Sequence, residues 1–247
     1  MATKVYLGYP SQHVIDWIKS HAQPASHPET RVKYSNGSTA TYNIVGELET
    51  DACGDGCSEI FIENVHDAVE IDIGNTVTSI GYDVFSGCNG LTSVTIPNSV
   101  TNIRERAFYD CKGLTGVMIP ANVMGIENSA FSRSGLKSVT IPSSVTTIGE
   151  EAFYDCSDLT SVTLSSGVAG IGFRAFADCN GLKSVTIPDS VTTIGEGAFY
   201  SCSSLTNVTI PDSVESIELD AFWGCSGLMS VTYERRTRND IEDNNLI

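Results

Sequence analysis

The chain has 247 residues, of which 41% are hydrophobic and 18% are charged, so it holds enough apolar side chains for a substantial core. Its 30 acidic and 14 basic residues give a formal net charge of −16, which argues against binding to nucleic acids or anionic membranes, because both are bound through clustered Lys and Arg. No apolar run approaches the ~20 residues that a membrane-spanning helix needs, so no membrane span is predicted.

Residues 1–66 are expected to form a small α+β cap that covers the first end of the structure that follows. The stretch SQHVIDWIKSHA, residues 11–22, is predicted to be a short amphipathic helix that begins at Ser11. The stretch RVKYSNGSTATYNIV, residues 31–45, is predicted to be a β-hairpin, because its central Asn-Gly pair is a strong turn signal. A separate attachment module is the alternative for this region. The N-terminus lacks an uninterrupted apolar stretch, so no secretory signal is predicted.

An acidic, solvated loop is expected over residues 46–59, and it contains Cys53 and Cys57. A local disulfide between these two cysteines is one alternative, and their pairing stays open. A metal site is disfavoured, because zinc takes four ligands and only His66 lies nearby in the sequence. The spacing of the acidic residues does not fit a calcium-binding EF-hand loop either. We therefore predict neither a metal nor a cofactor.

From residue 67 to residue 233 the chain repeats one pattern. A phenylalanine marks the same place in each copy, at Phe85, Phe108, Phe131, Phe153, Phe176, Phe199 and Phe222. The spacings between them are 23, 23, 22, 23, 23 and 23 residues. A fixed period in this range is the signature of a repeat architecture in which each copy is one structural unit. The sequence therefore predicts a repeat solenoid of about seven stacked coils.

One copy shows what a single coil contains. Val185 and Ile187 flank an outward-facing residue in the period-two alternation of a β-strand, and Pro188 ends that strand. Elsewhere the apolar residues are three apart and mixed with glycine and small polar residues, which is typical of turns and short 3₁₀ segments. A coil this short cannot bury its own apolar faces, so stacking on its neighbours must bury them.

The consensus AFxxCxxLxxVTIPxxVxxIGxxAF resembles the BspA-type leucine-rich repeat family, and the resemblance covers Asp67 to Tyr233. A few positions depart from the consensus, namely Arg104, Glu127, Ser134, Ser165 and Glu218. The resemblance implies a right-handed, leucine-rich-repeat-like solenoid whose strands form one sheet. It also implies an extracellular or cell-surface location, and binding to proteins, matrix or other cells.

Six cysteines occupy one position of the repeat: Cys88, Cys111, Cys156, Cys179, Cys202 and Cys225. A free cysteine behaves as a small buried apolar residue. We expect these six thiols to be reduced, to point into the core and to lie one above the other from coil to coil.

Residues between the core positions are the candidates for binding. Three columns run along the predicted strands, and together they define what we call the strand face. The first comprises Thr92, Thr115, Lys137, Thr160, Lys183, Thr206 and Met229; the second comprises Ser93, Gly116, Ser138, Ser161, Ser184, Asn207 and Ser230; the third comprises Thr95, Met118, Thr140, Thr163, Thr186, Thr209 and Thr232. Threonine also suits an exposed strand without any ligand, so a structural explanation stays open. Exposed aromatic residues are frequent anchors of interfaces. The positions directly after the phenylalanines supply four candidates, Tyr109, Tyr154, Tyr200 and Trp223. The alternative for these four is packing against the next coil.

Catalysis is not expected, because the chain has no phosphate-binding GxxxxGK, no GxSxG and no HExxH motif. We predict a non-catalytic module that binds a protein or glycan through the strand face. The alternative is a structural spacer or an assembly component of a surface layer, appendage or virus-like particle, and ice binding by the threonine columns is a remote third. Residues 234–247 are expected to form a polar tail.

Overall fold

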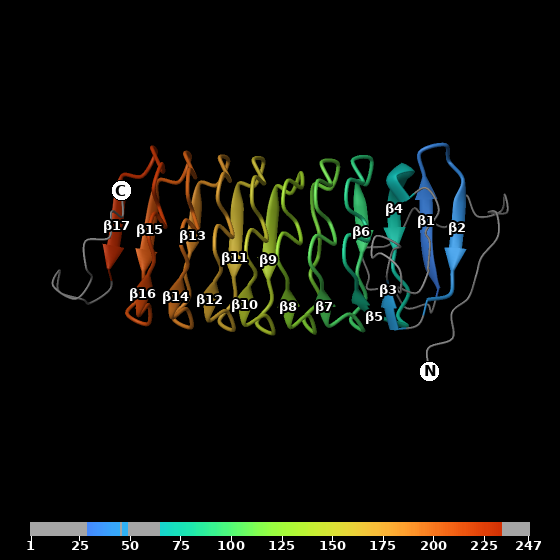
Figure 1. The fold of residues 1–247 in the computed structure, drawn as a ribbon, viewed down its shortest axis with the longest axis horizontal. Coiled ribbons are helices and arrows are strands. Elements are labelled where there is room, and N and C mark those ends of the chain that lie inside the picture. Colours follow the sequence, from blue (N-terminus) through green and yellow to red (C-terminus); the bar gives the residue numbers. More distant parts are fainter. Residues whose placement is uncertain (1–28, 45, 49–64, 234–247) are drawn as a thin grey trace, which may run out of the picture.

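The computed structural model describes residues 29–44, 46–48 and 65–233, and in this part of the chain a single file of stacked coils runs along the long axis of the molecule (Figure 1). The prediction of a repeat solenoid of about seven coils is confirmed. The predicted helix at residues 11–22, Cys53 and Cys57 of the predicted acidic loop, and the predicted tail at 234–247 lie outside the described residues.

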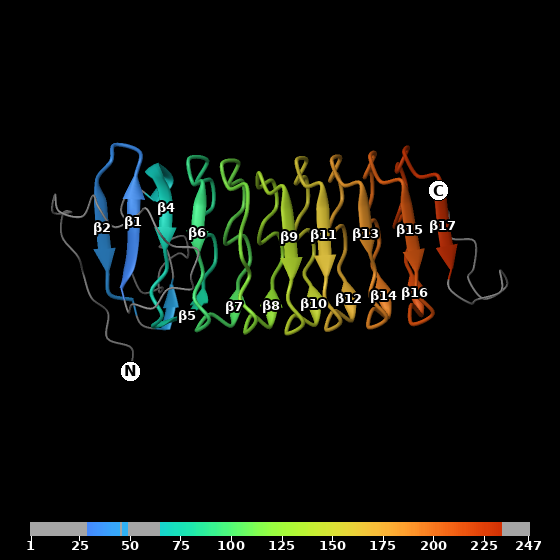
Figure 2. The same ribbon diagram turned by 180° about the vertical axis from the view of Figure 1, so that it is seen from behind.

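The longer strands of the coils lie side by side along the stack (Figures 1 and 2). They are β4 (Ala68–Asp72), β6 (Ser93–Thr95), β9 (Ser138–Ile141), β11 (Ser161–Leu164), β13 (Ser184–Thr186), β15 (Asn207–Ile210) and β17 (Ser230–Tyr233). β4 pairs with β6, and the odd-numbered strands β9, β11, β13, β15 and β17 form a five-stranded parallel sheet. The coil between these two groups has no strand at this place and makes only an isolated bridge from Gly116 to Ser138.

A second set of very short strands runs along the lower edge of the stack in Figure 1, and we call it the short-strand sheet. Its members are β3 (Gly46–Leu48), β5 (Val77–Ile80), β7 (Asn102–Ile103), β8 (Gly125–Ile126), β10 (Thr147–Ile148), β12 (Gly170–Ile171), β14 (Thr193–Ile194) and β16 (Ser216–Ile217). The expectation of one sheet is therefore wrong, because each coil becomes extended a second time, after a turn that in most coils begins with proline, and pairs there with its neighbours. β3 also occupies part of the segment predicted to be an acidic loop.

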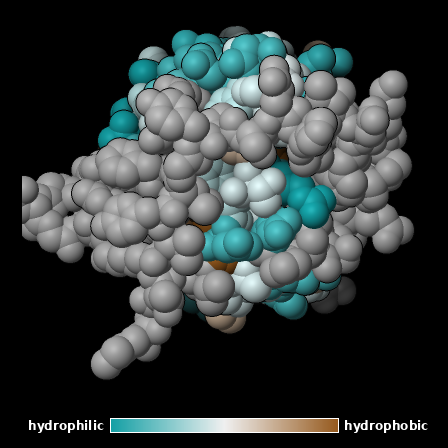
Figure 3. All heavy atoms as spheres, turned by 90° about the vertical axis from the view of Figure 1, so that its right-hand side faces the viewer, coloured by the Kyte–Doolittle hydropathy of each residue, from teal (hydrophilic) through white to brown (hydrophobic). Residues whose placement is uncertain are grey.

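The first end of the stack carries an antiparallel pair, β1 (Thr30–Tyr34) and β2 (Thr39–Tyr42), at the place of the predicted hairpin. Its turn contains Gly37, whose φ of +82° is readily adopted by glycine. β1 also pairs antiparallel with β4, and a short 3₁₀ helix, η1 (Val65–Asp67), precedes β4. The described atoms visible at this end in Figure 3 are mostly hydrophilic or neutral, with only small hydrophobic areas.

The core is a file of stacked phenylalanine rings. Consecutive rings from Phe85 to Phe222 are stacked with centroids 5.1 to 5.4 Å apart, and all are at most 1% exposed. The backbone holds this spacing, since the amide N–H of each phenylalanine from Phe85 to Phe199 donates to an alanine carbonyl of the next coil; Phe153 donates to Ala175 at 2.8 Å, for example. The fixed period therefore produces a continuous aromatic core.

The cysteine column is buried and reduced, as predicted. Most of its thiols bridge coils, since Cys179 Sγ donates to the Phe153 carbonyl of the preceding coil at 3.1 Å and four others do the same. Ser134, which replaces cysteine in one coil, is buried as well, and its hydroxyl lies 3.4 Å from Cys156 Sγ.

Burial of these thiols predicts low reactivity and a loss of stability at high pH. It raises the pKa of Cys88 and Cys156 from 9.0 to about 12. We therefore expect the native thiols other than Cys225 to resist a thiolate-selective reagent at about pH 8 and all six thiols of the column to react in denaturant. Unfolded thiols ionise near pH 9.0, whereas the native thiols of Cys88 and Cys156 stay neutral there. Cys225 is the exception in the column, because its hydrogen bond with Cys202 lowers its pKa. The free energy of unfolding should thus be intact below that pH and fall as the pH rises toward about 12. Fast labelling of Cys88 or Cys156 in the native protein, or urea midpoints that do not fall with pH in this window, would contradict the assignment.

Candidate binding surface

The third column of the strand face is aligned by the parallel register of the five-stranded sheet. Thr163 is in register with Thr140 and Thr186, and the row continues to Thr209 and Thr232. All five side chains are exposed, because the residues on either side of each threonine point toward the core in most of these strands.

Two members of this column differ from the prediction. Thr95 is only half-buried and belongs to β6, which is in register with β4 rather than with the five-stranded sheet. Met118 was expected in a strand but lies in the coil that has none, and its side chain is 74% exposed. The regular part of the strand face therefore starts at β9.

The second column is aligned in the same way. Ser138, Ser161, Ser184, Asn207 and Ser230 are in register and exposed. Near the last coil these side chains also bond to one another, since Ser230 Oγ donates to Asn207 Oδ1 at 2.7 Å. The column thus presents short hydroxyl and amide groups at a constant spacing.

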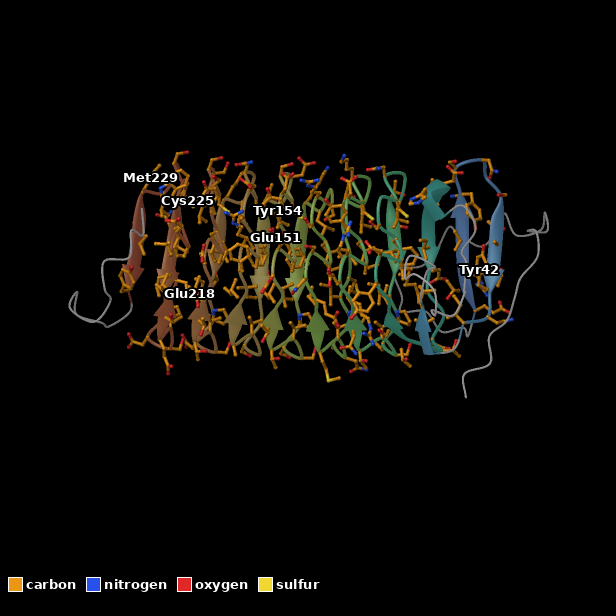
Figure 4. The ribbon with its side chains drawn as sticks, viewed as in Figure 1. Tyr42, Glu151, Tyr154, Glu218, Cys225 and Met229 are labelled. Carbon is orange, nitrogen blue, oxygen red and sulfur yellow. The ribbon has the colours of Figure 1, made fainter. Side chains whose placement is uncertain are left out.

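Six of the seven residues of the first column fall into two groups, and the seventh, Thr115, is exposed in the coil that has no strand at this place. The hydroxyls of Thr92, Thr160 and Thr206 donate to the backbone carbonyl of the equivalent residue in the preceding coil, at 2.9, 3.0 and 3.3 Å respectively. These threonines therefore stabilise the stacking of coils. Three other members of the column, Lys137, Lys183 and Met229, have no hydroxyl to make this bond, and all three are exposed. Met229 is 84% exposed and projects from the last coil (Figure 4).

Charge is distributed unevenly around each coil. The five strands β9, β11, β13, β15 and β17 contain no charged residue. Lys137 directly precedes β9, and Lys183 directly precedes β13. Charged side chains gather instead in the turns around the phenylalanines, at Asp83, Arg106, Asp110, Arg133, Glu151, Asp155, Arg174, Asp178 and Asp220. On a chain of net charge −16, the strand face over these five strands is therefore an almost neutral polar surface.

The four predicted aromatic anchors lie in the turn after each phenylalanine, outside the strands, and we call this region the aromatic corner. Tyr109, Tyr154 and Tyr200 are half-buried, whereas Trp223 is 46% exposed. The ring of Tyr200 stacks on that of Trp223 with centroids 4.9 Å apart. Packing against the next coil thus accounts for a part of this column, and only its last member is widely exposed.

Arginine side chains cover several rings of the aromatic corner, and the sequence analysis missed this. The Arg106 guanidinium lies 4.7 Å from the centre of the Tyr109 ring, and Arg133 Nη1 donates to the Tyr109 hydroxyl at 3.0 Å. The hydroxyl of Tyr154 instead bonds to Asp178, and burial together with this carboxylate raises the pKa of Tyr154. A signal was present, since Arg106 precedes Tyr109 by three residues in a turn, but the partner from the next coil could not be read from spacing.

Nowhere in 29–44, 46–48 or 65–233 do three or more His, Cys, Asp or Glu side chains come together in a way that could hold a metal ion. The same part of the chain contains no helix that is long and apolar enough to cross a membrane.

Comparisons with known proteins agree with this architecture. The chain matches the model of the BspA type leucine rich repeat region, with six copies, over residues 58–180 and 124–245. A leucine-rich repeat protein from Bacteroides ovatus is similar in fold, with a TM-score of 0.58 at 24% identity over 92% of this chain and 71% of that one.

The leucine-rich repeat protein of T. pallidum is also similar, with 32% identity and a TM-score of 0.52. The match covers 56% of this chain and 64% of that one, so the present chain spans less than two thirds of the treponemal protein. No curated protein matches the chain. The family model covers well over half of the chain, and the chain therefore belongs to the BspA-type leucine-rich repeat family.

Proposed function

We propose that the protein is a non-catalytic recognition module that binds a protein or a glycan through the strand face. The observation that carries this proposal is the pair of aligned columns on β9 to β17, which expose hydroxyl and amide groups and no charge on a strongly acidic chain. Small neutral polar groups lose their water at lower cost than charged ones when a partner covers them. They also offer donors and acceptors at the spacing of parallel strands, ~4.8 Å.

Strand propensity explains a part of this surface, because threonine is favoured on exposed strands. It does not require that all five strands lack Lys, Glu and Asp, which are ordinary residues on solvent-exposed surfaces. The absence of charge from β9 to β17, next to turns that are rich in charge, favours a surface kept neutral for contact.

Specificity would come from the members of the first column whose side chains do not bond to the preceding coil. Thr92, Thr160 and Thr206 are engaged by the backbone, so Lys137, Lys183 and Met229 are the side chains that a ligand meets first. Two ammonium groups and a flexible apolar side chain along one edge fit a ligand with acidic or hydroxyl groups and an apolar patch.

The second candidate is a structural spacer. The described coils are joined by the short-strand sheet, by the longer strands and by the amide bonds beside the phenylalanines, and such a stack is a stiff rod. A spacer needs only its ends to bind, so it is indifferent to the chemistry of the strand face.

Replacing Lys137, Lys183 and Met229 together with threonine separates these two functions. Recognition predicts that retention on a panel of immobilised polysaccharides and purified extracellular proteins falls at least ~10-fold, because the variable contacts are lost. The matched control replaces Lys112 and Met124, which are exposed outside the strand face, and should bind like the unmodified protein. Both variants should keep their thermal midpoints. Equal retention of the two variants and the unmodified protein would overturn the proposal.

A further inference from the structure

Arginine side chains cover three tyrosine rings of this chain, namely Tyr109 and Tyr200 in the aromatic corner and Tyr82, which precedes Phe85. The Arg104 guanidinium lies 5.4 Å from the centre of the Tyr82 ring, and Arg174 lies 5.6 Å from that of Tyr200. Tyr109 has two such partners, Arg106 at 4.7 Å from its own turn and Arg133 at 5.8 Å from the next coil. A guanidinium over an aromatic face is a favourable cation–π contact.

Trp223 has no such arginine among the described residues, and Tyr154 has none either, but the hydroxyl of Tyr154 bonds to Asp178. One face of its indole stacks on Tyr200, and the side chain is still 46% exposed. The position three residues before the ring, from which Arg106 covers Tyr109, holds Asp220. The position from which Arg133 covers Tyr109 belongs to a following coil, and Trp223 is in the last coil that the structure describes. No cation of the described residues lies over this ring.

The residues that flank Trp223 in the sequence are exposed and partly apolar. Leu219 is 50% exposed, and Gly224, next to the ring, is exposed with a φ of +75°. In the previous coil the position of Leu219 is taken by Glu196, so the last coil is less polar at this corner. Glu218 and Cys225 mark this coil in Figure 4.

We propose that Trp223 and Asp220 form a docking site for an arginine of a basic segment in a partner protein. Indole is the best aromatic partner for a cation. The carboxylate of Asp220 offers the guanidinium a charge-assisted hydrogen bond at the position where the chain places its own arginine for Tyr109. Arginine fits better than lysine because its planar group can stack on the ring and bond to the carboxylate at once. The net charge of −16 attracts a basic partner from a distance. This inference does not rest on the proposed role of the strand face.

The test uses the full chain with Trp17→Phe, so that Trp223 is the one remaining tryptophan. An arginine–glycine peptide is titrated, with lysine–glycine and glutamine–glycine peptides of equal length for comparison. The arginine peptide should change Trp223 fluorescence in a saturable way and bind at least ~3-fold tighter than the lysine peptide. Unchanged fluorescence, or equal binding of the arginine and lysine peptides, would overturn the proposal. This readout needs no variant of the site.

Calorimetry on variants then assigns the contacts. Trp223→Leu keeps the net charge and should weaken binding of the arginine peptide at least ~10-fold, and Asp220→Asn should weaken it about 3–10-fold. Tyr109→Leu is the matched control and should bind normally, because the chain already covers that ring. Equal binding by Trp223→Leu and the unmodified chain would show that the peptide senses only net charge.

The arginines of the chain itself are a competing occupant, since Arg235, Arg236 and Arg238 follow the last strand. A variant with all three replaced by glutamine should bind the arginine peptide within about 2-fold of the unmodified chain. A gain of ~10-fold or more would assign the site to the chain's own C-terminal segment and would overturn the partner proposal.

Discussion

Replacing Phe153 with alanine is expected to lower the free energy of unfolding by about 3–5 kcal/mol. Its ring is fully buried and stacks on Phe131 at 5.4 Å and on Phe176 at 5.2 Å. The amide N–H of Phe153 donates to the Ala175 carbonyl of the next coil at 2.8 Å, and this bond fixes the distance between the two coils. The neighbouring rings cannot close the gap, so a cavity remains. Urea denaturation followed by circular dichroism measures the loss.

Two controls accompany this variant. Phe222→Ala removes the last ring, which has one described neighbour, Phe199 at 5.2 Å, and should cost only about 2 kcal/mol because the site can collapse. Thr163→Ala changes an exposed strand residue and should stay within about 0.5 kcal/mol of the unmodified protein. If Phe153→Ala cost no more than Phe222→Ala, the continuous aromatic core would not be what stabilises the stack.

Replacing Gly135 with alanine should cost about 2–3 kcal/mol, because the added methyl group would overpack the space between two coils. Gly135 lies in the one coil that is a residue shorter than the others. A Cβ atom there would lie 2.1 Å from the Lys112 carbonyl oxygen and 3.0 Å from its carbon. Both are backbone atoms, so the coils would have to separate. The thermal or urea midpoint should fall accordingly.

Gly116 provides the matched control in the preceding coil. A Cβ atom there meets nothing within 4 Å. Gly116→Ala should therefore leave the native state unstrained and raise the free energy of unfolding by about 0.4–1 kcal/mol, because the unfolded chain loses freedom. Similar effects of the two substitutions would mean that the shortened coil is not packed against Lys112 as described.

Much of the fold could be predicted because the chain repeats. A residue that recurs every 23 positions must occupy the same place in every coil, so the burial of Phe153 and Cys179 followed from their spacing alone. The short-strand sheet could not be predicted, because strands of two residues such as Thr147–Ile148 are too short to show an alternating pattern. β3 was missed for the same reason, because it has only three residues. It also precedes the first recognisable copy of the repeat, so no pattern pointed to its pairing with β5.

The candidate surface could be predicted less completely. Alternation in the strands correctly indicated that Thr163 and its equivalents are exposed. It could not show that the Thr160 hydroxyl donates to the Lys137 carbonyl of the preceding coil, because that contact depends on the distance and register between neighbouring coils. The arginine that covers Tyr109 from the next coil, Arg133, was missed because it is far away in the sequence. Contacts between coils thus decide which side chains remain available to a ligand.

Amide hydrogen exchange tests the role of the strand face most directly. It is measured with and without the polysaccharide or extracellular protein that the panel experiment retains. We predict that added protection is concentrated in β9, β11, β13 and β15 and in the residue that precedes each strand. Protection confined to the short-strand sheet, or to the two ends of the stack, would contradict it.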